Sequence, residues 1–297
     1  MEPDDFSALV LGPASRGLAK VPGAPRLSSA SAAPLREIGA CDEHGATRML
    51  YLPIERPLTL VVDGREIVTL LTLGAAPEWL ALGYLRNQRL IEDVTEIRSV
   101  EVDWTRGVAE ISRHADPGAR SSGGESGRED ATPIGCGLGT AFGDELSRFD
   151  ALAPVMAGTT SQAVLFAVLD SMRQYDAIHR AAGSVHGCAL FLGGELLAAV
   201  EDVSRHNGVD IITGFMRLHA VDGSDKMLFT TGRLTAEMVM KAAHNGIPVM
   251  ISRNGATALG YQLAVKLGMT LIGRAAKGRY LCYVGAERIA RDAPGIS

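Results

Sequence analysis

The chain has 297 residues, of which 46% are hydrophobic and 21% charged, and 29 Lys and Arg against 34 Asp and Glu give a formal net charge of -5. This composition is typical of a soluble globular protein with one large or two ordinary domains. The acidic balance excludes a protein that coats nucleic acid. The sequence has neither a membrane-length apolar run nor a secretory signal, so we expect a cytoplasmic protein without a membrane partner.

Residues 1–46 are rich in Ala, Ser, Pro, Gly and Arg and show little apolar periodicity. Such a segment buries too little apolar surface to offset the entropy cost of ordering its backbone. We therefore expect a disordered leader over residues 1–46, with the folded part beginning near Met49.

Residues 47–114 are predicted to form a smaller β-rich N-terminal subdomain. Asp63-Gly64 lies between two β-branched runs, which is a hairpin signal. Pro77 opens an amphipathic helix. The expected elements are strands over 58–62 and 66–71, a helix over 77–90, and a strand pair around 96–104 and 108–112.

Residues 115–145 are expected to be a flexible Gly/Ser stretch that leads into a cysteine loop. In this loop Cys136 lies among glycines, so its thiol is sterically open and able to move between partners. On local sequence alone, an unreactive loop cysteine fits equally well. The other cysteines form no CxxC pair and are Cys41 in the leader and Cys188 and Cys282 in apolar strand runs.

Residues 146–297 alternate between helical and strand periodicity, as an α/β domain does. Gly193-Gly194 marks a hairpin, and three strand-then-helix steps follow it. These steps imply parallel strands with functional loops at their carboxyl ends. The expected elements are helices over 160–180, 207–219, 235–245 and 256–267, and strands over 186–192, 195–200, 226–230, 247–252, 269–273 and 279–284.

Positive charge is concentrated between residues 231 and 279, where seven Lys and Arg accompany one acid, Glu237. Several of these cations directly follow predicted strands, so neighbouring strands would bring them to one rim, where helix N-termini also direct their N–H groups. Such a rim suits phosphates, which arginine forks bind in bidentate fashion. The alternative is a set of solvated cations, with Lys241 and Lys266 on exposed helix faces.

A dense polar run, residues 201–210, lies between a predicted strand and a predicted helix. Asp202 or Ser204 is placed to cap the helix. The run is interpreted either as ligand groups or as an N-cap cluster whose members satisfy one another. The side chains of the first helical turn that can reach a ligand or each other are Arg205, His206 and Asn207.

Segments spread along the chain resemble one known family. They are Glu55–Leu58, Leu80–Leu85, Ala182–His186, Glu201–Asp210, Thr231–Met238, Gly246–Val249 and Ser252-Arg253. In this order and spacing they are similar to the formate dehydrogenase accessory sulfurtransferases (FdhD type), over about residues 55–289.

The resemblance implies a sulfur carrier, with a persulfide intermediate, that takes sulfane sulfur from a cysteine desulfurase. It implies transfer to the molybdenum bis(guanine dinucleotide) cofactor for the formate dehydrogenase catalytic subunit. That polyanionic cofactor is the bound substrate, and a guanine nucleotide such as GDP is expected in the same site. The implied fold is a cytidine-deaminase-like mixed sheet with flanking helices, without a metal site, in a homodimer.

The resemblance also implies functional residues. Cys136 is expected to carry the persulfide. The cofactor-binding segment of the family matches Arg274, Ala275, Ala276, Lys277, Gly278 and Arg279. Further cofactor contacts are expected from His186, Asp202, Arg205, His206, Asn207, Asp210, Thr231, Gly232, Arg233, Ser252 and Arg253.

One position departs from the family pattern. The family loop usually reads Cys-x-x-Cys, whereas Cys136 is followed by Gly139 at the second position. A one-cysteine mechanism stays possible if reduced molybdenum accepts the sulfur, and an oxidised metal would require a second thiol or an outside reductant. A chaperone that delivers the cofactor without sulfur transfer is the first alternative. A nucleotide-metabolising enzyme is the second, and the lack of paired metal ligands counts against it.

Overall fold

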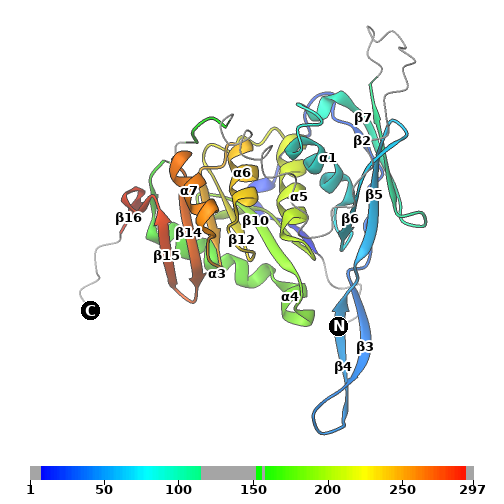
Figure 1. Cartoon of the computed structure of the whole chain (residues 1–297), viewed down its shortest axis with the longest axis horizontal. Coiled ribbons are helices and arrows are strands. Elements are labelled where there is room, and N and C mark those ends of the chain that lie inside the picture. The colour runs from blue at the N-terminus through cyan, green and yellow to red at the C-terminus, as the bar shows by residue number, and fades with distance from the viewer. Residues whose placement is uncertain (1–7, 115–151, 156–157, 292–297) are drawn as a thin grey trace.

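A seven-stranded mixed sheet forms the larger part of the molecule (Figure 1). The computed structural model describes residues 8–114, 152–155 and 158–291. In the strand order β1-β11-β10-β12-β13-β14-β15, β12, β13 and β14 run parallel to one another and the other neighbours are antiparallel. The strands are β1 (Leu9–Leu11), β10 (His186–Leu192), β11 (Glu195–Asp202), β12 (Lys226–Thr230), β13 (Val249–Ser252), β14 (Thr270–Ala276) and β15 (Arg279–Val284).

Helices cover both faces of this sheet. Successive side chains of a strand point to opposite faces, and apolar side chains on both faces must be covered. In β10, Cys188 and Leu190 join the core beneath α5, α6 and α7, whereas Ala189 and Phe191 join a second core beneath α3. The prediction of a mixed α/β fold is confirmed. The helices are α3 (Gln162–Tyr175), α4 (Ala177–Ala182), α5 (Arg205–Leu218), α6 (Ala236–His244) and α7 (Ala258–Lys266).

The N-terminal part contains a five-stranded sheet and one helix, and it shares its core with the α/β part. Helix α1 packs against α5 with close backbone contact, since a Cβ at Gly83 would lie 1.7 Å from the Asp210 carbonyl oxygen. The elements are β2 (Arg26–Leu27), β5 (Arg56–Val62), β6 (Arg65–Thr72), β7 (Ile97–Asp103), β8 (Val108–Arg113) and α1 (Pro77–Asn87).

A two-stranded hairpin, β3 (Leu35–Cys41) and β4 (Thr47–Pro53), extends away from the body of the molecule (Figure 1). Within the described residues, none of the helices combines the length and the hydropathy of a bilayer span. The short elements are η2 (Pro13–Ser15), η3 (Val94–Glu96), β9 (Thr160–Ser161), η4 (Ala286–Arg288) and β16 (Ile289–Ala290).

The prediction of a disordered leader is wrong over residues 8–46. Strand β1 extends the seven-stranded sheet by pairing with β11, β2 pairs with β7, and β3 pairs with β4. The first two strands have only two or three residues and find their partners far along the chain, so the local composition carries little signal of them. The Gly/Ser stretch and the Cys136 loop predicted over residues 115–145 lie outside the described residues.

Candidate cofactor-binding edge

The predicted ligand residues come from strand ends that meet at one edge of the seven-stranded sheet, which we call the carboxyl edge. Strands β12, β13 and β14 are parallel neighbours, so their carboxyl ends lie side by side. Strand β11 ends at the same edge, because Asp202 pairs with His186 at the start of β10, which runs antiparallel to β12. The structure therefore brings together the strand-end loops that the sequence analysis singled out.

Hydrogen bonds tie these loops to one another. The Ser252 hydroxyl donates to the Gly232 carbonyl at 2.5 Å, and the Asn254 side-chain amide donates to the Thr231 carbonyl at 3.0 Å. The Arg274 N–H donates to the Asn254 carbonyl at 2.8 Å. Asn254, which was not predicted from the sequence, thus joins the ends of all three parallel strands, and only its place in the short loop after β13 could have suggested this.

Four cations are exposed at the carboxyl edge, and none of them forms an ion pair with a described residue. Backbone geometry helps to present two of them. Arg274 has a φ of 51° at an irregularity in the β14–β15 pairing, and such bulges redirect side chains. Lys277 and Gly278 form the hairpin turn with φ values of 51° and 72°. The four exposed cations are Arg233, Arg274, Lys277 and Arg279.

Two helix N-termini reinforce this charge. Helices α6 and α7 begin just after the loops that follow β12 and β13. The Thr257 hydroxyl caps α7 by accepting from the Gly260 N–H at 3.2 Å. Uncapped N–H groups and the helix dipole both favour an anion at such an end. The edge therefore has the chemistry of a polyanion site.

Arg253 does not belong to the exposed set. Its guanidinium forms an ion pair with Asp176, whose side chain is 5% exposed, and lies 5.7 Å from the centre of the Phe229 ring. The carboxylate and the aromatic ring hold Arg253 toward the α3 side of the sheet. The structure thus gives this arginine a carboxylate partner, whereas Arg233 forms no ion pair with a described residue.

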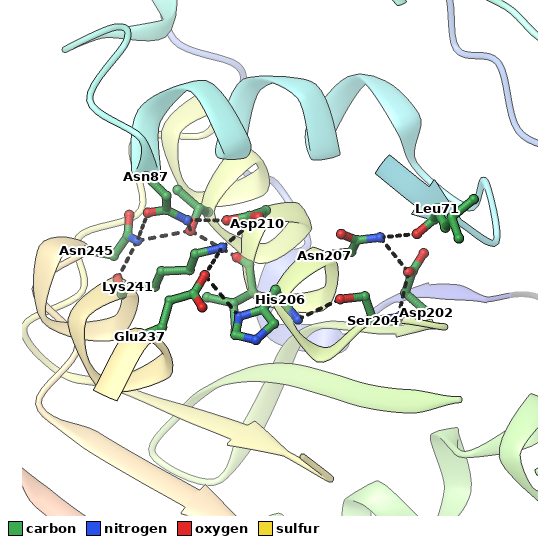
Figure 2. Close-up of polar contacts among 12 residues, drawn as sticks. Leu71, Asn87, Asp202, Ser204, His206, Asn207, Asp210, Glu237, Lys241 and Asn245 are labelled. Carbon is green, nitrogen blue, oxygen red and sulfur yellow. Dashed lines mark hydrogen bonds and ion pairs between the residues drawn. The ribbon is translucent and has the colours of Figure 1, made fainter. Parts of the chain in front are cut away.

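Asp202 and Asn207, predicted to contact the cofactor, are buried and bonded within the chain (Figure 2). Asp202 accepts from the Thr72 hydroxyl at 2.6 Å, from the Leu73 N–H at 3.0 Å and from the Asn207 amide at 2.8 Å. The helix cap itself is Ser204. The arrangement agrees with the N-cap interpretation of the polar run, and it also fastens β6 to the start of α5.

Asp210 belongs to a second buried group, which we call the polar network, between α1, α5 and α6 (Figure 2). Its carboxylate accepts from the Lys241 ammonium at 2.9 Å and from the Asn87 amide at 2.6 Å. The alternative of an exposed Lys241 is wrong, because its side chain is 6% exposed and its ammonium pairs with the Asp210 carboxylate, which is 2% exposed. The polar network consists of Asn87, Asp210, Thr213, Lys241 and Asn245.

His186, Arg205 and His206 stay at the carboxyl edge. The His186 Nδ1 lies 3.5 Å from the Thr231 hydroxyl, and burial together with the charges of Arg205 and His206 lowers the pKa of His186. The Arg205 side chain packs on Gly232, where a Cβ would lie 2.7 Å from its Cδ. The lowered pKa favours the neutral form of His186, and Arg205 places a positive charge beside it.

His206 contacts Glu237, the single acid among the cations of residues 231–279. The His206 Nδ1 lies 3.2 Å from Glu237 Oε1, which lies 3.6 Å from the Lys241 ammonium. Burial acts to raise the pKa of Glu237, but the contact with His206 and the charge of Lys241 outweigh burial and lower that pKa to about 2. Glu237 is therefore ionised at the edge.

Two surface hollows lie away from this edge. One, of about 570 Å³, lies on the five-stranded sheet beside Arg26 and Arg98. The other, of about 610 Å³, lies beside His244 and Gly246 at the far end of α6. Neither hollow is lined by any of the predicted site residues.

The cysteines within the described part of the chain do not suit sulfur transfer equally. Burial raises the pKa of the Cys188 thiol far above its usual range, so this cysteine stays protonated beneath Gly208. Cys282 is half-buried and donates to the Val284 carbonyl, and burial raises its pKa also. Cys41 is exposed on the β3–β4 hairpin. Cys136, the predicted persulfide carrier, lies outside the described residues.

Comparison with known proteins identifies the family. The sequence profile of the FdhD/NarQ family matches residues 53–290. The chain belongs to the FdhD/NarQ family. Its relatives include proteins named sulfur carrier protein FdhD from Bacillus licheniformis and Bacillus subtilis, each 30% identical to this chain. Both alignments cover 79% of this chain and 88% of the relative.

A solved structure has a similar fold. It is a crystal structure of a candidate formate dehydrogenase accessory protein from Desulfotalea psychrophila, with a TM-score of 0.68 and 25% sequence identity. The superposition covers 86% of this chain and 98% of that chain. The FdhD/NarQ match contains every strand that ends at the carboxyl edge, and it also contains the position of Cys136. The resemblance stated from the sequence is thereby confirmed.

Proposed function

We propose that this FdhD/NarQ protein carries sulfane sulfur from a cysteine desulfurase to the molybdenum bis(guanine dinucleotide) cofactor, for use by formate dehydrogenase. The observation that carries the proposal is the carboxyl edge, where exposed cations lie beside two helix N-termini in a chain whose relatives are named sulfur carriers. Within the same proposal, the partners are the desulfurase, the catalytic subunit of formate dehydrogenase and a second copy of the chain.

The edge supplies the binding half of this function. The phosphates of the cofactor would be held by Arg233, Arg274 and Arg279, with Lys277 as a further point charge. The hydrogen bonds of Asn254 fix the backbone from which Arg274 and the Thr231-Gly232 loop project, so little ordering is left for the moment of binding. A guanine nucleotide such as GDP carries the same phosphate chemistry and would occupy the same surface.

Cys136 supplies the transfer half. Its thiolate attacks the outer sulfur of the donor persulfide, which forms a new S–S bond on Cys136 and releases the donor thiolate. The terminal sulfur then passes to molybdenum as the substrate. Reduced molybdenum gives up an electron pair, the carried sulfur becomes a bound sulfide, and the Cys136 thiolate leaves. The electrons balance without a second cysteine, which agrees with Gly139 at the position where the family usually has one.

Gly139 also favours a second candidate, a chaperone that binds and delivers the cofactor without moving sulfur. The two candidates share the carboxyl edge and differ in Cys136 alone. In the chaperone a Cys136→Ala substitution leaves formate dehydrogenase activity intact, and in the sulfur carrier it abolishes that activity.

Mass spectrometry of the full chain after incubation with a cysteine desulfurase and cysteine tests the proposal. The sulfur carrier predicts a gain of one sulfur mass that maps to the Cys136 peptide and is lost in Cys136→Ala. The matched control is Cys41→Ser, which removes an exposed cysteine and retains the gain. Sulfur found only on Cys41, or no gain at all, contradicts the sulfur carrier and leaves the chaperone.

A further inference from the structure

Strand β14 is irregular where it reaches the carboxyl edge. Gly273 pairs with Leu281 of β15. The next pair is Ala276 with Arg279, so two residues of β14 face a single residue of β15, and this count defines a β-bulge. The first bulged residue is Arg274, whose φ of 51° lies in the left-handed region. Glycine usually fills such a position, so an arginine there needs a physical explanation.

The bulge decides on which side of the sheet Arg274 lies. Successive side chains of a regular strand alternate between the two faces, and Ile272 belongs to the core beneath α3. A regular strand would therefore turn Arg274 into that same core. Instead Ala275 is buried beneath α3, and Arg274 is exposed. The left-handed residue thus keeps a charge out of the core and presents it at the edge.

Two groups press on the backbone just before the bulge. A Cβ at Gly273 would lie 2.7 Å from the Asn254 carbonyl oxygen and 2.6 Å from Cε2 of the Tyr283 ring, so a larger residue would push both groups away. The same Asn254 carbonyl accepts from the Arg274 N–H at 2.8 Å. The start of the bulge is therefore held by a close contact at Gly273 and by a hydrogen bond at Arg274.

Asn254 is exposed, yet it is tied to two strand ends besides that of β14. Its backbone N–H donates to the Ser252 hydroxyl at 2.9 Å, within its own loop. Its side-chain amide donates to the Thr231 carbonyl at 3.0 Å, in the loop after β12. Because the carbonyl that holds the Arg274 N–H belongs to the same residue, the side-chain bond helps to fix where that carbonyl lies.

We propose that Asn254 is a positioning residue for Arg274 at the carboxyl edge. Its side chain anchors the loop after β13 to the loop after β12, and its carbonyl holds the bulge that turns the arginine outward. This inference rests on the proposed function, since the anion that Arg274 meets there is a phosphate group of the cofactor. An arginine whose backbone is already fixed loses less conformational freedom on binding, so the anchor raises affinity.

Hydrogen exchange of the full chain, followed by NMR, tests the anchor without any ligand. Asn254→Ala removes the side-chain bond to Thr231, so we expect the Arg274 amide to exchange about twofold to tenfold faster, the range for loss of one neutral hydrogen bond. The matched control is Gln262→Ala, which removes an exposed amide from α7 and should leave that rate unchanged. An unchanged rate in Asn254→Ala overturns the proposal.

A double-mutant cycle tests the positioning role. The probe is inorganic diphosphate, titrated into the full chain and followed by calorimetry. We expect its affinity to fall about twofold to tenfold in Asn254→Ala. Beside Arg274→Gln, Asn254→Ala should have no further effect, because the side chain through which it acts is gone. Beside Arg233→Gln, Asn254→Ala should keep its full effect.

Thermal melting of each variant shows that it is folded. Because Asn254 is exposed, we expect Asn254→Ala to melt with the wild-type chain. If Asn254→Ala fails to fold, Asn254→Ser replaces it in both experiments.

The outcomes that overturn the inference differ in what else they affect. If Asn254→Ala keeps its full effect beside Arg274→Gln, or loses it beside Arg233→Gln, Asn254 does not act through Arg274, and the phosphate-binding edge stands. If the wild-type chain binds no diphosphate, the anion site of the proposed function falls together with this inference.

Discussion

The carboxyl edge and the polar network contain the same kinds of residue and differ in burial. In the network, Lys241 and Asp210 are 6% and 2% exposed and form an ion pair. At the edge, Arg233 and Arg274 are exposed and form no ion pair with a described residue. Charge in the interior must be paired to be tolerated, whereas charge at an open edge stays available for a ligand. Burial therefore separates the residues that hold the fold from those that can bind.

Glu237 joins the two regions. Its Oε1 lies 3.6 Å from the Lys241 ammonium of the network and 3.2 Å from the His206 Nδ1 at the edge. Glu237 and Lys241 are one turn apart on α6, yet the Glu237 side chain is partly exposed and the Lys241 side chain is buried. The comparison predicts that loss of a network charge costs stability, whereas loss of an edge charge costs binding.

The largest expected effect is on stability, in Lys241→Ala. This substitution leaves the buried Asp210 carboxylate without its counter-ion, and breaking a buried pair costs about 3–5 kcal/mol of the free energy of unfolding. Lys277→Ala, which removes the same charge from the exposed edge, should change that free energy by less than about 0.5 kcal/mol. Urea denaturation of both variants measures the difference. Equal losses of the free energy of unfolding would contradict the distinction between the buried network and the exposed edge.

A smaller loss is expected in Asp202→Ala. Four donors lose their acceptor, among them the Thr72 hydroxyl and the Leu73 N–H, at a site where Asp202 is 0% exposed. We expect about 2–4 kcal/mol, the cost of a few unsatisfied buried groups. Denaturant unfolding checks this value, and a loss below about 1 kcal/mol would show that the cluster is solvated.

Arg274→Gln should alter binding and spare the fold. Because Arg274 is exposed, the free energy of unfolding should stay within about 0.5 kcal/mol of the wild-type value. Affinity for GDP should fall about tenfold to a hundredfold, and its dependence on salt should weaken. Arg65→Gln on the five-stranded sheet is the control and should bind GDP normally. Unchanged affinity in Arg274→Gln would remove this arginine from the site.

The last expected effect concerns the dependence of stability on pH. Burial raises the pKa of Glu201 to about 7, against the opposing hydrogen bonds from the Ile178 and His179 N–H groups. Between its ordinary value of 4.5 and about 7 the folded chain binds more protons than the unfolded chain, so stability falls as the pH rises through this window.

Glu201→Gln measures this contribution. The free energy of unfolding should decline less between about pH 5 and about pH 7.5 in Glu201→Gln than in the wild-type chain. Burial and the charges of nearby arginines lower the pKa of His244 to about 4, which has the opposite effect and cancels between the two proteins. Parallel pH profiles would contradict the assignment.

Much of the α/β part could be predicted from the sequence because its elements are long and regular. The strands predicted over 186–192, 226–230 and 279–284 have those bounds in the structure, and the helix predicted over 235–245 is α6. Their alternation of apolar residues, with glycine at the turns, is a local signal. Strand order alone then brings Arg233 and Arg274 to one edge.

What the sequence could not predict depends on contacts between distant residues. Arg233 and Arg253 occupy similar places after parallel strands, yet Arg253 is bound by Asp176, which lies on the far side of the sheet from α5. Asp202 accepts a hydrogen bond from Thr72 at the end of β6, more than a hundred residues earlier in the chain. Strand β1 pairs with β11, which lies nearly two hundred residues later in the chain. No pattern in the neighbouring residues of the sequence predicts any of these three pairings.

A crystal structure of the full chain with GDP bound tests the central claim most directly. The account predicts that the diphosphate lies at the carboxyl ends of β12, β13 and β14, within hydrogen-bond distance of Arg233 and Arg274. A diphosphate in the hollow beside His244 at the opposite end of α6, or on the five-stranded sheet, would contradict it.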